Sequence, residues 1–227
     1  MKRRKNLERA VILGLLLSTS IYGSAWAEES GPITDDFTNS KQNESFTVNG
    51  AGSTAIDVDG KTVNITTINS DDGDITVTNN VTGIDLNSGS VILNAAGNNI
   101  IESKVNGIVS TGNGNVSLKA DSNSIIVNDV NGKAINGIEA NSSDIIIESN
   151  KGDLSINLKT TSANANGISV GSTQAGGSVE LKTDIGDIKI DVKTGSPDAK
   201  NGNVYGIYAI KKSEVILNSG KNIIITT

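Results

Sequence analysis

The sequence of 227 residues contains no cysteine and no histidine, and it has only two prolines. A chain without cysteine forms no disulfide, so its fold must rest on packing and backbone hydrogen bonds. Serine–histidine and cysteine–histidine catalysis are excluded, and a typical zinc site lacks its usual ligands. We therefore expect no catalytic residue, no metal site and no cofactor.

Arginine and aromatic residues are scarce as well. All three arginines lie before residue 10, and the chain after residue 27 carries 14 lysines against 24 acidic residues. Phosphate contacts need clustered positive charge, so we expect no nucleic-acid partner. The core must consist of Ile, Val and Leu, and the β-branched members of that group favour strands. The aromatic residues after residue 27 are Phe37, Phe46, Tyr205 and Tyr208.

The first 27 residues read as a secretory signal peptide. A basic segment from Met1 to Arg9 precedes an apolar run from Ala10 to Leu17, and the small-x-small sequence of residues 25–27 follows. This order predicts cleavage after Ala27. The apolar run is short for a membrane span, and no second run follows. We expect the protein to be exported.

A Gly-Ile pair recurs through the rest of the chain. From an earlier, degenerate copy at Ala55-Ile56 onward, the isoleucines are spaced by 28, 24, 30, 30 and 39 residues. Such self-similarity is typical of a repeat architecture. Glycine at this position fits a corner that needs a positive φ or a close backbone approach. The full pairs are Gly83-Ile84, Gly107-Ile108, Gly137-Ile138, Gly167-Ile168 and Gly206-Ile207.

Two further β patterns lie between successive pairs. Each block opens with a polar turn residue and then alternates apolar residues with others, so one face of each strand is expected to be buried. The first block occurs at 62–65, 90–93, 115–118, 144–147, 178–181 and 214–217. The second occurs at 74–77, 99–101, 124–127, 153–156, 187–190 and 222–225.

The repeat predicts an all-β fold, a right-handed parallel β-helix of about six three-stranded coils. One coil cannot bury its own apolar face, so the units are stable only as a stack. Ile56, Ile84, Ile108, Ile138, Ile168 and Ile207 should form one internal ladder, and Val63, Val91, Val116, Ile145, Val179 and Val215 another. The alternative is an antiparallel β-sandwich, because Asn106-Gly107, Asn136-Gly137 and Asn166-Gly167 are good hairpin signals.

The pattern divides the chain into three parts: a signal peptide at 1–27, a polar linker and possible N-terminal cap at 28–50, and β-helix repeats at 51–227. The chain stops on the last strand of a coil, at Ile225-Thr226-Thr227, with no polar cap after it. An open end exposes unpaired backbone, so we expect a C-terminal truncation or a continuation in the natural context.

Two candidate sites emerge. Asp71 and Asp72 form a carboxylate pair of the kind that glycoside hydrolases use, but the pair lies where other coils have a polar turn, which is the favoured interpretation. Outward positions of the middle strand alternate between polar residues and isoleucine. Ile92, Ile146 and Ile216 therefore predict an outward contact stripe, with β propensity on a tolerant face as the simpler explanation.

The signal peptide, the Gly-Ile phase, the Asn/Ser/Gly-rich turns and the lack of cysteine resemble the β-helical passenger domains of autotransporters and related large adhesins of Gram-negative bacteria. The resemblance covers about residues 50 to 227 and is one of pattern. It implies display at the cell surface or release outside the cell. In that family an outer-membrane β-barrel carries the passenger across the membrane, and these residues contain no barrel pattern.

The resulting functional hypothesis is an adhesin-like, non-enzymatic passenger that contacts host or neighbouring-cell surface molecules, or associates with itself in biofilms. Two alternatives remain open. One is a β-helical carbohydrate-active enzyme, since β-helices also carry such enzymes. The other is a passive stalk that holds a distal domain away from the cell.

Overall fold

The structure is a computed structural model that describes residues 28–42, 44–68, 73–129, 131–161, 164–172, 175–195, 203–210 and 212–227. These residues form strands only, and every pairing among them is parallel. The strands are β1 Glu28–Ser30, β2 Phe37–Gln42, β3 Phe46–Asn49, β4 Thr54–Ile68, β5 Ile75–Asn94, β6 Asn98–Ser110, β7 Gly114–Ala120, β8 Ser122–Asn128, β9 Ile135–Ala140, β10 Asp144–Ser149, β11 Leu154–Thr160, β12 Ala165–Val170, β13 Ser178–Thr183, β14 Ile188–Thr194, β15 Val204–Ala209, β16 Glu214–Ser219 and β17 Ile223–Thr226.

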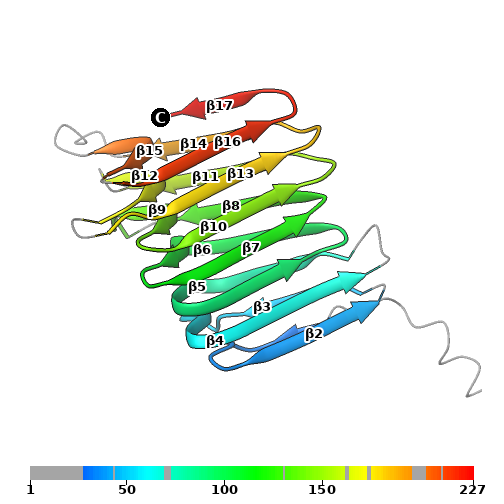
Figure 1. The fold of residues 1–227 in the computed structure, drawn as a ribbon. Coiled ribbons are helices and arrows are strands. Elements are labelled where there is room, and N and C mark those ends of the chain that lie inside the picture. The colour runs from blue at the N-terminus through cyan, green and yellow to red at the C-terminus, as the bar shows by residue number, and fades with distance from the viewer. Residues whose placement is uncertain are drawn as a thin grey trace, which may run out of the picture.

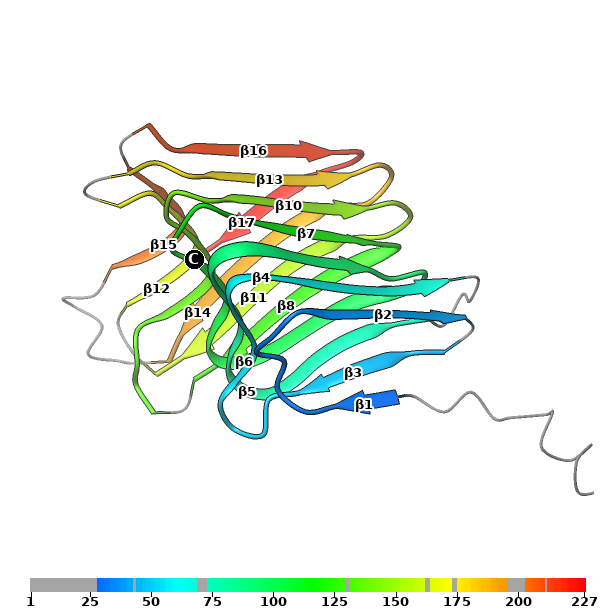
Figure 2. The ribbon, with the colours of Figure 1, turned by 60° about the horizontal axis from the view of Figure 1, so that its bottom comes forward.

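The strands wind around one axis as a parallel β-helix, which confirms the predicted fold and excludes the antiparallel sandwich (Figure 1). Each coil contributes one segment to each of three faces, and β4, β5 and β6 continue around corners from one face to the next. Face 1 contains β9, β12, β15 and the Gly-Ile parts of β4 to β6. Face 2 contains β2, β7, β10, β13 and β16 with the C-terminal parts of β4 and β5. Face 3 contains β1, β3, β8, β11, β14 and β17 with the N-terminal parts of β5 and β6 (Figure 2).

Both predicted ladders are confirmed by the strand register. On face 1, Ile56 pairs with Ile84, and the pairing continues coil by coil to Ile207. On face 2, the ladder from Val63 to Val215 is equally continuous. These side chains are fully buried except in the last coil, so like residues pack on like along the interior.

Residues 28–50, for which we expected a polar linker and possible cap, contribute β1, β2 and β3. Ile33 bridges to Ile56 on face 1, Phe37 pairs with Val63 on face 2, and Phe46 pairs with Ile75 on face 3. They form a further coil beneath the six predicted ones. At the opposite end, the side chains of Ile223, Ile224 and Ile225 are exposed. Among the described residues, no helix is long and apolar enough to cross a membrane.

The Gly-Ile pair is a bulge within a face 1 strand, and not the corner that the sequence predicted. In β9 and β12 two successive residues, the glycine and the isoleucine, are both buried, and the register steps over the glycine. A Cβ atom at Gly137 would lie 2.5 Å from Ile156 Cγ2 and 2.6 Å from the carbonyl oxygen of Gly167. Of the two reasons considered for glycine, the close approach applies here, since none of these glycines has a positive φ. The Asn-Gly dipeptides are therefore parts of this bulge and not hairpin turns.

The predicted blocks on face 3 need a correction in two coils. Ile125 pairs with Ile156 and not with Leu154, so the strand expected at 124–127 begins two residues earlier. Asn99 and Asn123, which resemble turn residues, lie inside at the level of Ile75 and Leu154. Their side chains are only 1% and 2% exposed. At 124–127 the offset is two residues, which keeps the same side chains inside and escapes a periodicity argument. At 99–101 it is one residue, so Asn99 takes the inward position that was predicted for Ile100, and Ile100 points outward.

Candidate functional site

The predicted isoleucine stripe lies on face 2. Ile92, Ile146 and Ile216 are 36%, 40% and 41% exposed. The register places them in one straight column, in which Ser117 and Glu180 separate them. They therefore stand two coils apart, at about 9.6 Å intervals. Nothing in the geometry assigns them a ligand by itself.

Charged residues flank this column on both sides. On one side Glu148 lies between two lysines, 3.5 Å from Lys119 Nζ and 3.9 Å from Lys182 Nζ. On the other side, two residues before the isoleucines, lie Asp144 and Glu214, both exposed. Face 2 thus presents an apolar stripe with a net positive edge and a negative edge.

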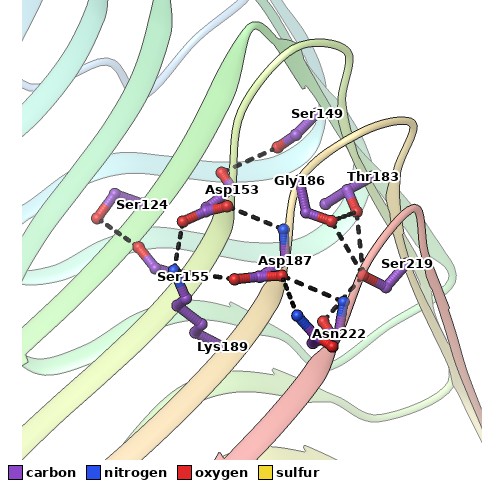
Figure 3. Close-up of polar contacts among 10 residues, drawn as sticks. All are labelled: Ser124, Ser149, Asp153, Ser155, Thr183, Gly186, Asp187, Lys189, Ser219 and Asn222. Atoms are coloured by element: carbon purple, nitrogen blue, oxygen red, sulfur yellow. Dashed lines mark hydrogen bonds and ion pairs between the residues drawn. The ribbon is translucent and has the colours of Figure 1, made fainter.

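The turn between face 2 and face 3 contains a polar network (Figure 3). Asp153 Oδ1 accepts the backbone N–H of Asp187 at 2.9 Å, and Asp187 Oδ1 accepts the backbone N–H of Asn222 at 3.1 Å. Lys189 Nζ bridges the two carboxylates, 2.5 Å from Asp153 and 3.3 Å from Asp187. The lysine ammonium holds the pKa of Asp153 below its usual range, and the two carboxylates raise the pKa of Lys189. These groups satisfy one another from coil to coil, so the network stabilises turns.

The carboxylate of Asp129 also has a structural role, separate from this network. Its side chain is only 3% exposed. It accepts the backbone N–H groups of Asn131 at 2.9 Å and Lys133 at 2.7 Å, and the hydroxyl of Thr160 at 3.2 Å. Burial pushes the pKa of Asp129 upward, but these hydrogen bonds outweigh burial, and the pKa lies below its usual value. The carboxylate fixes the loop that leads from face 3 to face 1.

Replacing Asp129 by asparagine should destabilise the protein by about 2 kcal/mol near neutral pH, because an amide NH₂ would face backbone donors. The contribution of a carboxylate with a depressed pKa is present above its unfolded pKa of about 3.9 and is lost as the pH falls through the folded pKa. The difference between wild type and Asp129→Asn should therefore shrink below about pH 4. Urea unfolding at neutral and acidic pH measures it. Asp184→Asn, at an exposed ion pair, is the control, and an equal effect there would contradict this role.

The bulge on face 1 has a consequence for its outer surface. Because two buried residues separate them, the residue before the glycine and the residue after the isoleucine both point outward, three positions apart. In β9, Asn136 Nδ2 donates to Glu139 Oε2 at 2.8 Å. In β15, the rings of Tyr205 and Tyr208 are stacked, with centroids 5.1 Å apart and planes at 28°. A strict two-residue alternation would have placed the members of each pair on opposite sides.

A hollow of about 300 Å³ adjoins the two tyrosines, and it is lined by Ala134, Asn164, Asn166, Asn203, Tyr205 and Tyr208. In the sequence these tyrosines stand out only as rare aromatic residues. The signal that could have found the site is the polar or aromatic residue on each side of four of the five Gly-Ile pairs, with Val109 as the exception.

The remaining carboxylates and predicted positions do not add to a candidate site. Asp71, Asp72 and the cleavage site after Ala27 lie outside the described residues. On face 1, burial raises the pKa of Asp85, with smaller contributions from Asp57 and Glu139. Within the described ranges, no group of three or more Asp or Glu side chains is placed to hold a metal ion.

No family model matches the chain, and searches of the curated proteins and of the solved structures found no match.

Proposed function

We propose that this chain is an exported, adhesin-like β-helical passenger that mediates contact between cells and has a binding role in place of a catalytic one. The observation that carries the proposal is the isoleucine column of face 2, formed by Ile92, Ile146 and Ile216. Exposed isoleucines aligned on a flat face offer apolar surface that a partner can remove from water. The leader sequence and the absence of cysteine suit an extracellular location without disulfides.

We propose a second copy of the chain as the partner of face 2. The column of Lys119, Glu148 and Lys182 carries net positive charge, while Asp144 and Glu214 line the opposite edge of the stripe. A copy turned by half a turn about an axis parallel to the stack brings the isoleucine columns together. It also sets the lysine edge of each copy beside the acidic edge of the other. Complementary edges of this kind favour one orientation of approach.

The test is a triple variant, Ile92→Thr, Ile146→Thr and Ile216→Thr, in the protein as exported by a bacterial host. Threonine keeps the β-branched shape and removes apolar contact area, so the strands should persist while self-association weakens by at least tenfold. Sedimentation velocity over a concentration series measures the association, and aggregation of cells that display the chain gives a second readout.

A matched control places the same change on face 3, at Ile100, Ile126 and Ile224, whose side chains also point outward. This control should associate as the wild type does. Equal association by the wild type and the face 2 variant would overturn the proposal, as would an equal loss in both triple variants. Circular dichroism verifies that each variant keeps its strands.

A further inference from the structure

The two tyrosines of β15 form the only aromatic pair on the outer surface of the described residues. The other two aromatic rings, Phe37 and Phe46, pack together near the first coil. Tyr205 and Tyr208 are 38% and 39% exposed. They occupy outward positions of the strand, although large apolar rings would be expected at its inward positions. Their rings stack on one another, and both side chains line the hollow while more than a third of each residue remains exposed.

The neighbouring side chains are amides. Of the six described residues that line the hollow, three are asparagines and none is charged. Asn166 Nδ2 donates to Asn136 Oδ1 at 2.9 Å, which uses one of its two N–H groups and leaves further hydrogen-bonding capacity on the amide. Binding sites generally combine apolar contact area with a few such placed polar groups.

An aromatic ring beside amides fits one ligand chemistry well. A pyranose ring has an apolar C–H face that packs on an aromatic ring, and a rim of hydroxyl groups that both donate and accept hydrogen bonds. Asparagine amides both donate and accept, and tyrosine combines an apolar ring with a polar tip. The hollow of about 300 Å³ is at the small end of ligand sites, which suits one or two sugar units.

The charge of the chain selects among saccharides. After residue 27 the protein carries 24 acidic residues against 14 lysines, and no cation among the described residues lines the hollow. An anionic sugar would meet no positive side chain in the described part of this site and would approach an acidic protein. We propose that Tyr205 and Tyr208, with Asn166, form a binding site for a neutral hexopyranose or N-acetylhexosamine unit of a surface glycan. This site is on face 1 and does not depend on the role proposed for face 2.

The chain offers a direct spectroscopic test. After residue 27 it contains no tryptophan, and Tyr205 and Tyr208 are its only tyrosines, so the intrinsic fluorescence of the processed protein reports on this pair alone. Neutral oligosaccharides of glucose, mannose, galactose and N-acetylglucosamine are titrated, with a sialylated oligosaccharide as the anionic probe. At least one neutral series should give a saturable change in emission, and the sialylated probe should give none.

Variants then localise the binding on an array of the same glycans. Tyr208→Ala should weaken binding at least tenfold, whereas Tyr208→Phe should keep most of it, because the ring is retained. The face 2 triple variant should bind sugar as the wild type does. Absence of binding to every neutral series would overturn the inference, as would equal binding by Tyr208→Ala or stronger binding of the sialylated probe. Self-association of Tyr208→Ala, measured in parallel, separates this outcome from failure of the face 2 proposal.

Discussion

Gly137→Ala is expected to destabilise the protein by about 3 kcal/mol, although it adds a single methyl group. That group would lie 2.5 Å from Ile156 Cγ2, 3.0 Å from Leu158 Cδ1 and 2.6 Å from the carbonyl oxygen of Gly167. The isoleucine could change rotamer, but the carbonyl belongs to the paired strand of the next coil and cannot retreat without loss of sheet hydrogen bonds. The relief must therefore come from a shift between coils, which would disturb the packing on both sides of the bulge.

The free energy of unfolding, from urea titration followed by circular dichroism, measures this effect. Gly195→Ala is the matched control, because a Cβ atom there would meet only the Thr160 carbonyl oxygen at 3.7 Å and the backbone has no positive φ. The control should change stability by less than about 0.5 kcal/mol. Equal stability of the two variants would show that the interior has room at the bulge, contrary to the close packing inferred from these distances.

The phase of the repeat could be predicted from the sequence because aliphatic residues recur at corresponding positions of faces 1 and 2 in every coil from Ile56 onward. A ladder such as Ile84, Ile108 and Ile138 is visible because the Gly-Ile pair recurs, at spacings of 24 and 30 residues here. The first coil was missed because it offers single apolar residues, Ile33 and Phe37, within a polar stretch. Their burial depends on the coil above, and a local pattern cannot report contact between distant segments.

The outer surface was harder to predict than the interior. The exposed isoleucines of face 2 follow from simple alternation, and the structure places them in the expected column. The proximity of Tyr205 and Tyr208 does not follow, because alternation assigns residues three apart to opposite sides. The proximity of the two rings requires the bulge at Gly206-Ile207, in which two successive residues point inward. The sequence alone does not show that both residues point inward.

Buried asparagine in this fold follows a rule that links two positions of the same coil. In four of the six coils from residue 51 onward, the last inward position of face 2 is Ser or Thr, whose hydroxyl donates to a carbonyl ahead of face 3. Examples are Thr183 to Gly186 at 2.7 Å and Ser219 to Asn222 at 2.9 Å. Two coils have alanine there, Ala95 and Ala120, and in these coils alone asparagine replaces the aliphatic residue that begins the face 3 ladder. The amide thus places a hydrogen-bond donor beside the alanine, and it donates to carbonyl groups of face 2 strands, those of Lys119 for Asn99 and Glu148 for Asn123.

Asn123→Leu should accordingly lower the free energy of unfolding by about 3 kcal/mol, even though Leu154 occupies the equivalent position one coil later. Asn123 Nδ2 donates to the Glu148 carbonyl at 2.7 Å and to Ser149 Oγ at 2.9 Å, and its Oδ1 accepts from Asn99 at 2.9 Å. Leucine removes all three bonds and leaves buried polar groups without them.

Two comparisons separate this network from a general cost of adding leucine to the sheet. Asn157→Leu, at an exposed position in the neighbouring coil, should change stability by less than about 0.5 kcal/mol. The double variant Asn99→Leu with Asn123→Leu should be less destabilised than the two single effects predict together, because both single variants already break the bond between the two amides. Strict additivity would mean that the asparagines act independently. An Asn123→Leu protein as stable as the wild type would mean that alanine at the turn needs no amide donor, and the pairing of Ala120 with Asn123 would then have no energetic basis.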